Sequence, residues 1–247
     1  MNALLAARNV TKTYGGVVAN RNVSLSVPRG AIVGLIGPNG SGKTTLFSCI
    51  AGSHPIDSGS IVFDGAEISR KRPAEVARLG LLRTFQRTRV YGRMSCMQNM
   101  VVSAPRARET LRAMFSRSSL ESSGRAEELL EFVGLHGKRF LRAGELSFGQ
   151  QKLLELAMAL MNEPKLLLLD EPTAGINPTL INGLVDRLRR ANRELGVTLL
   201  VIEHDMRVIT ALAGYLYCLA HGELLAEGLP VALQHDPRVL DAYLGTH

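Results

Sequence analysis

The stretch that decides the fold reads Gly37-Pro38-Asn39-Gly40-Ser41-Gly42-Lys43-Thr44, and it fits the pattern G-x-x-x-x-G-K-[ST]. It follows an apolar run of strand length at residues 31–36 and precedes a helix expected to begin near Lys43. Glycines let such a loop bend until successive N–H groups point at one phosphate cluster. The start of the helix adds roughly half a positive charge there. The pattern predicts a nucleotide phosphate site, although a plain glycine turn that caps a helix is the alternative.

Within this loop, Lys43 is expected to reach the β- and γ-phosphates and Thr44 to bind Mg²⁺. We expect the loop's nucleotide contacts to be Gly37, Pro38, Asn39, Gly40, Ser41, Gly42, Lys43, Thr44 and Thr45.

A second motif places two carboxylates at the end of an apolar strand, in Leu166-Leu167-Leu168-Leu169-Asp170-Glu171. Two adjacent acids on a buried strand are costly unless a cation compensates them. Asp170 suits the coordination shell of Mg²⁺, and Glu171 can polarise a water for attack on the γ-phosphate. Asp-Glu before Pro172 could by itself be a turn signal, but with the phosphate loop it predicts a P-loop NTPase.

Hydrophobic patterning predicts an α/β core with a mostly parallel sheet. Strands are expected at residues 4–10, 23–27, 31–36, 61–63, 166–169 and 197–202, with a terminal hairpin at 215–225. The strand, helix and strand at 166–202 form a βαβ unit. Apolar residues spaced i, i+3, i+4 and i+7 from Ala126 to Val133 indicate a helix.

We therefore expect one domain over residues 1–247. Its α/β core comprises 1–87 and 144–247, a helical subdomain comprises 88–143, and a C-terminal tail comprises 228–247. The Arg- and Ser-rich stretch at 105–124 is expected to be a connection.

Composition limits the class of protein. With 247 residues, 46% hydrophobic and 21% charged, the chain is globular rather than mainly disordered. The absence of tryptophan argues against an aromatic carbohydrate cleft. Three cysteines far apart give no disulfide framework and favour a reducing compartment. No uncharged apolar run approaches the roughly 20 residues that span a bilayer, and we expect no signal peptide.

Charge is concentrated in one segment. The chain carries a net +7, whereas residues 70–117 contain twelve basic and two acidic residues. This segment is either a solvated face or a surface for anionic lipid or acidic loops. Nucleic acid is a weaker interpretation because aromatic residues are not interleaved with the basic ones.

The sequence Leu146-Ser147-Phe148-Gly149-Gln150-Gln151 precedes a long helix at 151–161 and resembles the LSGGQ signature of ABC ATPases. Ser147 could otherwise be an ordinary N-cap, and Phe148 departs from the usual glycine. The resemblance implies that Ser147, Phe148, Gly149 and Gln150 face the γ-phosphate of ATP bound by a partner subunit.

The other elements of the ABC family follow in order. Tyr14 matches the aromatic residue that stacks on adenine, and Gln86 matches the glutamine that joins the core to the helical insert and binds Mg²⁺. His204 matches the histidine that contacts the γ-phosphate. Asn177 stands in the D-loop where many members carry aspartate. The resemblance implies a catalytic set of Glu171, His204 and Gln86, and a metal set of Thr44, Gln86 and Asp170.

Within the family, the chain looks like the ATP-binding subunits of branched-chain amino-acid importers, of the LivG type. The resemblance is carried by the Arg83-Thr84-Phe85-Gln86 block, the Ser-Phe-Gly-Gln-Gln form of the signature, and the tail at 236–245. Subunits for urea, amides or lipopolysaccharide share parts of this pattern.

The resemblance implies an ATPase that uses ATP and Mg²⁺ to drive a transporter. In the ABC arrangement, the phosphate loop and the signature of one chain cannot face each other, so the resemblance implies that two subunits sandwich two ATP molecules, as a homodimer or with a paralogue. Partners are expected to be two integral-membrane permeases and, indirectly, a secreted solute-binding protein. The expected location is the cytoplasmic face of the inner membrane. Two alternatives are disfavoured. They are a soluble ABC ATPase acting on nucleic acid or ribosomes, and a regulatory subunit without turnover, which Glu171 and His204 argue against.

Overall fold

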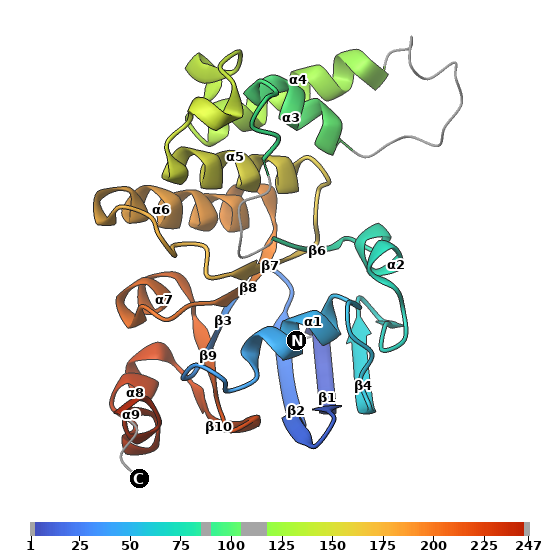
Figure 1. The fold of residues 1–247 in the computed structure, drawn as a ribbon, viewed down its shortest axis with the longest axis vertical. Coiled ribbons are helices and arrows are strands. Elements are labelled where there is room, and N and C mark those ends of the chain that lie inside the picture. The colour runs from blue at the N-terminus through green and yellow to red at the C-terminus, as the bar shows by residue number, and fades with distance from the viewer. Residues whose placement is uncertain (1–2, 85–89, 105–117, 245–247) are drawn as a thin grey trace. The chain divides into compact units, whose positions relative to one another are not determined.

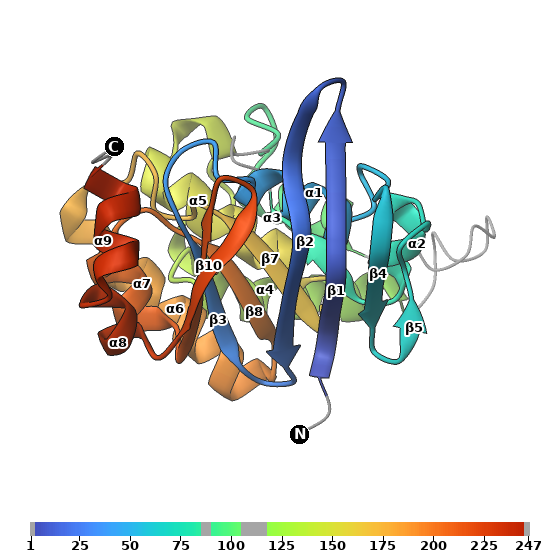
Figure 2. The same ribbon diagram turned by 90° about the horizontal axis from the view of Figure 1, so that it is seen from below.

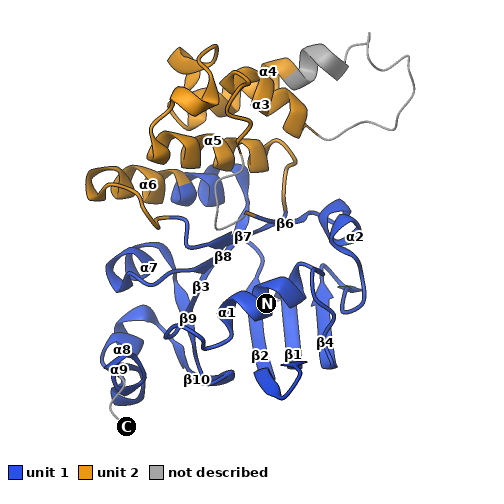
Figure 3. Cartoon of the chain, in the orientation of Figure 1, with its two compact units in different colours: residues 1–83, 165–172, 188–247 blue, residues 84–164, 173–187 orange. Residues whose placement is uncertain are grey.

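The computed structural model describes residues 3–84, 90–104 and 118–244, without the side chains of 118–122. The chain forms two compact units (Figure 3). Unit 1 comprises residues 1–83, 165–172 and 188–247, and unit 2 comprises residues 84–164 and 173–187. Each unit is described by itself below.

An antiparallel sheet begins unit 1. Its strand order is β2-β1-β4-β5, and its strands are β1 (Ala3–Tyr14), β2 (Val17–Pro28), β4 (Ser58–Phe63) and β5 (Ala66–Glu67). In β1 the side chains of Leu5, Ala7 and Val10 are buried, which gives the sheet one apolar face. The small antiparallel elements predicted near the N-terminus are confirmed.

The second sheet of unit 1 is mostly parallel, as predicted. Its order is β10-β9-β3-β8-β7-β6, with β3 (Ile32–Ile36), β6 (Leu81–Arg83), β7 (Leu166–Asp170), β8 (Thr198–Ile202), β9 (Tyr215–Ala220) and β10 (Glu223–Gly228). β10 alone of these strands runs antiparallel, against β9. Every residue of β7 and β8 is buried, which explains why these strands are continuous apolar runs.

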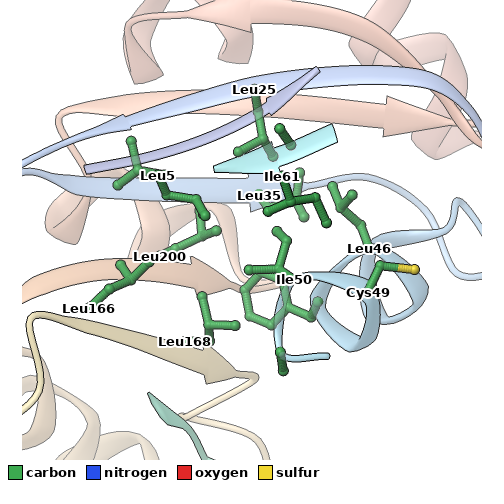
Figure 4. Packing of buried hydrophobic residues seen from close by; sticks show 14 of the residues in the cluster. Leu5, Leu25, Leu35, Leu46, Cys49, Ile50, Ile61, Leu166, Leu168 and Leu200 are labelled. Atoms are coloured by element: carbon green, nitrogen blue, oxygen red, sulfur yellow. The ribbon is translucent and has the colours of Figure 1, made fainter. Parts of the chain in front are cut away.

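The core of unit 1 lies around helix α1 (Lys43–Ile50) (Figure 4). Leu46 and Ile50 of this helix belong to the same buried cluster as Leu25 of the antiparallel sheet and Leu35 and Leu168 of the parallel sheet. One helix thus packs against both sheets. Because α1 follows the phosphate loop directly, this packing fixes the position of the loop's C-terminal end.

Short helices complete unit 1. They are α2 (Pro73–Arg78), α7 (Met206–Leu212), α8 (Pro230–Gln234) and α9 (Pro237–Leu244), along with residues 188–195 of α6 (Pro178–Leu195). Helices α8 and α9 contact one another, and both contact β10 (Figure 2). In the tail expected at 228–247, residues 230–234 and 237–244 are therefore helical and pack on β10.

Unit 2 is helical. It contains α3 (Cys96–Ser103), α4 (Ser118–Phe132), two short 3₁₀ turns (His136–Lys138 and Ala143–Glu145), α5 (Phe148–Leu160) and the start of α6 (Figure 1). Ala126, Leu129, Leu130 and Val133 are buried, as the helical spacing predicted. Helices α3, α4 and α5 contact one another.

One expectation about this region was wrong. Residues 118–124 were expected to belong to a connection, but they form the start of α4. Adding residues to a helix that has already formed costs little free energy, because the costly step is nucleation. The Ser-rich residues 118–124 can therefore extend the apolar, packed part of α4. The remainder of the expected connection, 105–117, lies outside the described residues. Among the described helices, none is both long and apolar enough to cross a bilayer.

Candidate nucleotide site

Several polar residues of unit 1 follow directly after strands of the parallel sheet, at the carboxyl edge of that sheet. β3 leads into the loop at 37–42, β8 into His204, β7 ends at Asp170 before Glu171, and β6 ends at Arg83. These four strands are neighbours in the order β3-β8-β7-β6 and run parallel. Their carboxyl ends therefore meet along one edge, which is where open α/β sheets bind ligands.

Two glycines of the loop are required by close backbone contacts. Gly37 has φ +141°, and a Cβ there would lie 2.1 Å from the carbonyl oxygen of Leu219. Gly42 has φ +96°, and a Cβ there would lie 2.3 Å from the carbonyl oxygen of Ala19. A side chain fits at neither position, so the glycines allow the loop to pass between β9 and β2 before α1 begins.

The ammonium group of Lys43 is folded onto its own loop. Its Nζ donates to the carbonyl oxygens of Gly37 at 2.7 Å and Pro38 at 2.8 Å, and to Ser41 Oγ at 3.3 Å. Burial lowers the pKa of Lys43, and the nearby carboxylate of Glu171 opposes this shift. The loop thus holds a cation beside its backbone N–H groups, an arrangement suited to an anion.

The other expected contacts of the loop differ in exposure. Asn39, Gly40 and Thr44 are exposed, Pro38, Gly42 and Thr45 are half-buried, and Gly37, Ser41 and Lys43 are buried. Thr44 is an exposed residue in the first turn of α1. The residue is therefore accessible to a ligand in solution.

Asp170 is paired with an arginine that the sequence analysis did not single out. Its side chain is 1% exposed, and its Oδ2 accepts from Arg83 Nη2 at 2.6 Å. Arg83 Nη1 also donates to Ser48 Oγ at 2.9 Å. The second oxygen, Asp170 Oδ1, is buried and has no hydrogen-bond partner among the described residues. The arginine supplies the compensating cation that a buried acid needs, and one carboxylate oxygen is left for a further ligand.

Glu171 and His204, predicted separately, are in direct contact. Glu171 Oε1 lies 2.6 Å from His204 Nε2, and the Glu171 backbone N–H donates to the carbonyl of Ile202 at 3.0 Å. Glu171 has φ +51°, an uncommon value for a residue other than glycine and one often found at functional sites. The backbone contact with the end of β8 holds Glu171 in this conformation and aims its carboxylate at His204.

Tyr14 ends β1, and 41% of the residue is exposed. Its hydroxyl lies 2.7 Å from His54 Nδ1, and Lys12 Nζ lies 5.2 Å from the ring centroid. His54 was not predicted, because it belongs to no motif of the sequence. A hydrogen-bonded ring with an open surface is suited to stacking on a base.

The signature residues belong to unit 2, at the start of α5. Ser147 is the N-cap: its Oγ accepts from Gln150 N–H at 3.4 Å, and Gln150 Oε1 accepts from Ser147 N–H at 3.2 Å. Ser147 and Phe148 are exposed, whereas Gly149 is buried. A Cβ on Gly149 would lie 3.0 Å from Leu180 Cδ1. Ser147 is therefore a cap, and its hydroxyl is also open to solvent. Gln86 lies outside the described residues.

Comparisons with known proteins agree with these features. Residues 20–174 match the family described as ABC transporter, and residues 223–247 match the family described as branched-chain amino acid ATP-binding cassette transporter. The chain is 34% identical, over 98% of its length and 95% of the relative, to a probable branched-chain amino acid transport ATP-binding protein LivG of Archaeoglobus fulgidus.

Solved structures give the same result. The crystal structure of the ADP conformation of an ATP-binding cassette of an ABC transporter matches with a TM-score of 0.87 and 32% identity, over 99% of this chain and 100% of that one. A dimeric bacterial ABC transporter cassette matches with a TM-score of 0.75 and 26% identity, over 92% and 98%. The resemblance found in the sequence is confirmed, and the chain belongs to the family of ABC transporter ATP-binding proteins, the ATPase cassettes of these transporters.

Proposed function

We propose that this chain is the ATP-binding and ATP-hydrolysing subunit of an importer for branched-chain, hydrophobic amino acids. The observation that carries the solute class is the match of residues 223–247 to the branched-chain cassette family, in a chain that also resembles LivG over nearly its whole length. Systems for urea, amides or lipopolysaccharide are the alternative.

ATP would bind with its phosphates on residues 37–45 and its adenine on Tyr14. The ammonium of Lys43 would exchange its carbonyl partners for phosphate oxygens, since a charged acceptor makes the stronger hydrogen bond. The position of Lys43 Nζ on the loop, within hydrogen-bond distance of Gly37 and Pro38, supports assigning the loop to the nucleotide.

Mg²⁺ fits the groups present. Asp170 Oδ1 is a buried oxygen without a partner among the described residues, and Thr44 is an exposed residue. Among the described residues, no group of three or more His, Cys, Asp or Glu side chains could hold a metal ion. The ion would therefore depend on phosphate oxygens and water as well. We assign Asp170, Thr44 and Gln86 to the ion, which when bound would neutralise charge on the phosphates.

Glu171 would act as the general base for the attacking water. His204, in contact with Glu171 Oε1, would orient that carboxylate and reach the γ-phosphate. Gln86 would complete the catalytic set. The contact between Glu171 and His204 supports a shared role, because a hydrogen-bonded partner restricts the rotation of the carboxylate.

Two subunits would form the working ATPase. Ser147, Phe148, Gly149 and Gln150, at the start of α5, would face the γ-phosphate held by the partner, with Gly149 closely packed and Ser147 exposed. We also infer that residues 88–143 act as the helical subdomain of a single ATPase domain. The two subunits are either identical or paralogous.

The remaining partners would be two permease subunits and, indirectly, a secreted solute-binding protein. The cassette would then lie on the cytoplasmic face of the membrane. The segment at 70–117, with twelve basic and two acidic residues, would face lipid headgroups or acidic permease loops.

Reconstitution tests this proposal. The chain is assembled in vesicles with candidate permease pairs and their binding proteins, and ATPase activity is followed as leucine, urea, amides or lipopolysaccharide is added. Leucine is expected to stimulate hydrolysis, and Glu171→Gln is the inactive control. Stimulation by another solute would move the chain to that class of transporter. Stimulation by duplex DNA or ribosomes without permeases would refute transport.

A further inference from the structure

Gly37 stands at the point where β3 leaves the sheet and the phosphate loop begins. The parallel ladder between β3 and β9 ends at the pair Ile36 and Cys218, so the N–H of Gly37 lies beyond the last paired residue. Gly37 is buried, and a buried N–H needs a partner.

The partner comes from the far end of the chain. The N–H of Gly37 donates to the hydroxyl of Tyr243, in α9, at 2.8 Å. The next polar group of the same residue, its carbonyl oxygen, accepts from Lys43 Nζ at 2.7 Å. Gly37 is therefore held on one side by the tail and on the other by the lysine expected to contact phosphate.

The tyrosine is suited to hold this amide. α9 contacts α8 and β10 (Figure 2), which anchors Tyr243 on unit 1, although 37% of the residue is exposed. Burial raises the pKa of Tyr243 to about 12. The phenol therefore stays protonated at neutral pH and offers an oxygen lone pair to Gly37.

We propose that Tyr243 is a positioning residue for ATP binding: its hydroxyl fixes the Gly37 amide and thereby presets the phosphate loop. The inference rests on the proposed nucleotide site at 37–45. It gives the C-terminal tail a role in the ATP affinity of its own subunit. A preset loop spends less binding energy on ordering when the ligand arrives.

The matched variants are Tyr243→Phe and Tyr217→Phe. Tyr217→Phe also removes a partly buried hydroxyl that is hydrogen-bonded to the backbone. In the wild type this hydroxyl accepts from Ser26 N–H at 3.0 Å and donates to the Ser26 carbonyl at 3.1 Å. That contact is made at Ser26 of β2, whereas the part of β2 that faces the loop is at Ala19. Each variant is made in the full chain and titrated with a fluorescent ATP analogue. Thermal unfolding, steady-state hydrolysis and amide exchange of Gly37 are measured alongside.

Tyr243→Phe is expected to weaken ATP binding about three- to tenfold, the effect of one lost hydrogen bond. KM for ATP should rise with kcat unchanged, and the Gly37 amide should exchange faster. Tyr217→Phe should lower thermal stability at least as much while leaving affinity and Gly37 exchange as in the wild type. Wild-type affinity in Tyr243→Phe, or equal loss of affinity in both variants, would overturn the inference.

A third variant, Lys43→Ala, distinguishes a failure of the role of Tyr243 from a failure of the nucleotide-site assignment. Loss of ATP binding in Lys43→Ala together with normal binding in Tyr243→Phe would refute only the role of the tail. Normal binding in Lys43→Ala would instead refute the assignment of the loop.

Discussion

Replacing Arg83 with methionine tests whether the sheet edge depends on a buried ion pair. Methionine keeps an apolar stem of similar length and removes the guanidinium that lies 2.6 Å from Asp170 Oδ2. The side chain of Asp170 is 1% exposed and that of Arg83 is 15% exposed. Water therefore cannot readily replace the lost cation, and the remaining carboxylate is a buried charge that has lost its directly bonded cation.

Breaking one partner of such a pair costs about 3–5 kcal/mol of the free energy of unfolding. For a chain of this length each kcal/mol lowers Tm by about 2–4 °C, so Arg83→Met should unfold roughly 6–20 °C below the wild type. Adding Asp170→Asn to Arg83→Met should restore most of the loss, because a neutral amide is far less costly to bury than a charge.

Thermal and urea unfolding of the four proteins of this double-mutant cycle measures the coupling. Arg21→Met is the control, because its ion pair with Glu223 is exposed on both sides and such pairs contribute at most about 1 kcal/mol. If Arg83→Met is as stable as Arg21→Met, or if Asp170→Asn adds to the loss, the charge of Asp170 is not what Arg83 compensates.

Three further predictions concern the site and its surroundings. Glu171→Gln should keep ATP affinity and lower kcat by about 10²- to 10⁴-fold, because it removes the base but keeps the size; size-exclusion chromatography with ATP and Mg²⁺ should show a trapped dimer, and a monomer with normal turnover would contradict both roles. Ser147→Arg should abolish turnover with little change in the affinity of the monomer, unlike Lys43→Ala, which should lose affinity; a fluorescent ATP titration in which both lose it equally would place Ser147 beside Lys43. Hydrogen bonds from Thr13 and Lys12 lower the pKa of Asp57 from 3.8 to about 2. The resulting stabilisation is therefore complete above pH 3.8 and is lost as the pH falls toward 2. The difference in urea midpoint between wild type and Asp57→Asn should shrink over that window, and a constant difference would refute the assignment.

Several elements were predictable because their signal is local. The strand at 31–36 and the loop after it were expected from consecutive residues, and the structure has β3 at Ile32–Ile36 and α1 from Lys43. The short strand β6 and the tail helices α8 and α9 were not expected. A three-residue strand and helices of five and eight residues are too short for periodicity to identify.

The sequence by itself indicated the family of this protein and the residues that we propose for its chemistry. Each motif is a run of consecutive residues, so its backbone geometry and charge follow from neighbouring residues. These motifs are the phosphate loop, the Asp170-Glu171 pair and the signature at 146–151. The tertiary structure alone decided which groups meet. Arg83 and Asp170 are 87 residues apart, Glu171 and His204 are 33 apart, and Gly37 and Tyr243 are 206 apart. These contacts follow from the strand order β3-β8-β7-β6 and from the packing of the tail on β10. That order is set by which buried strands pair across the sheet, and no local pattern encodes it.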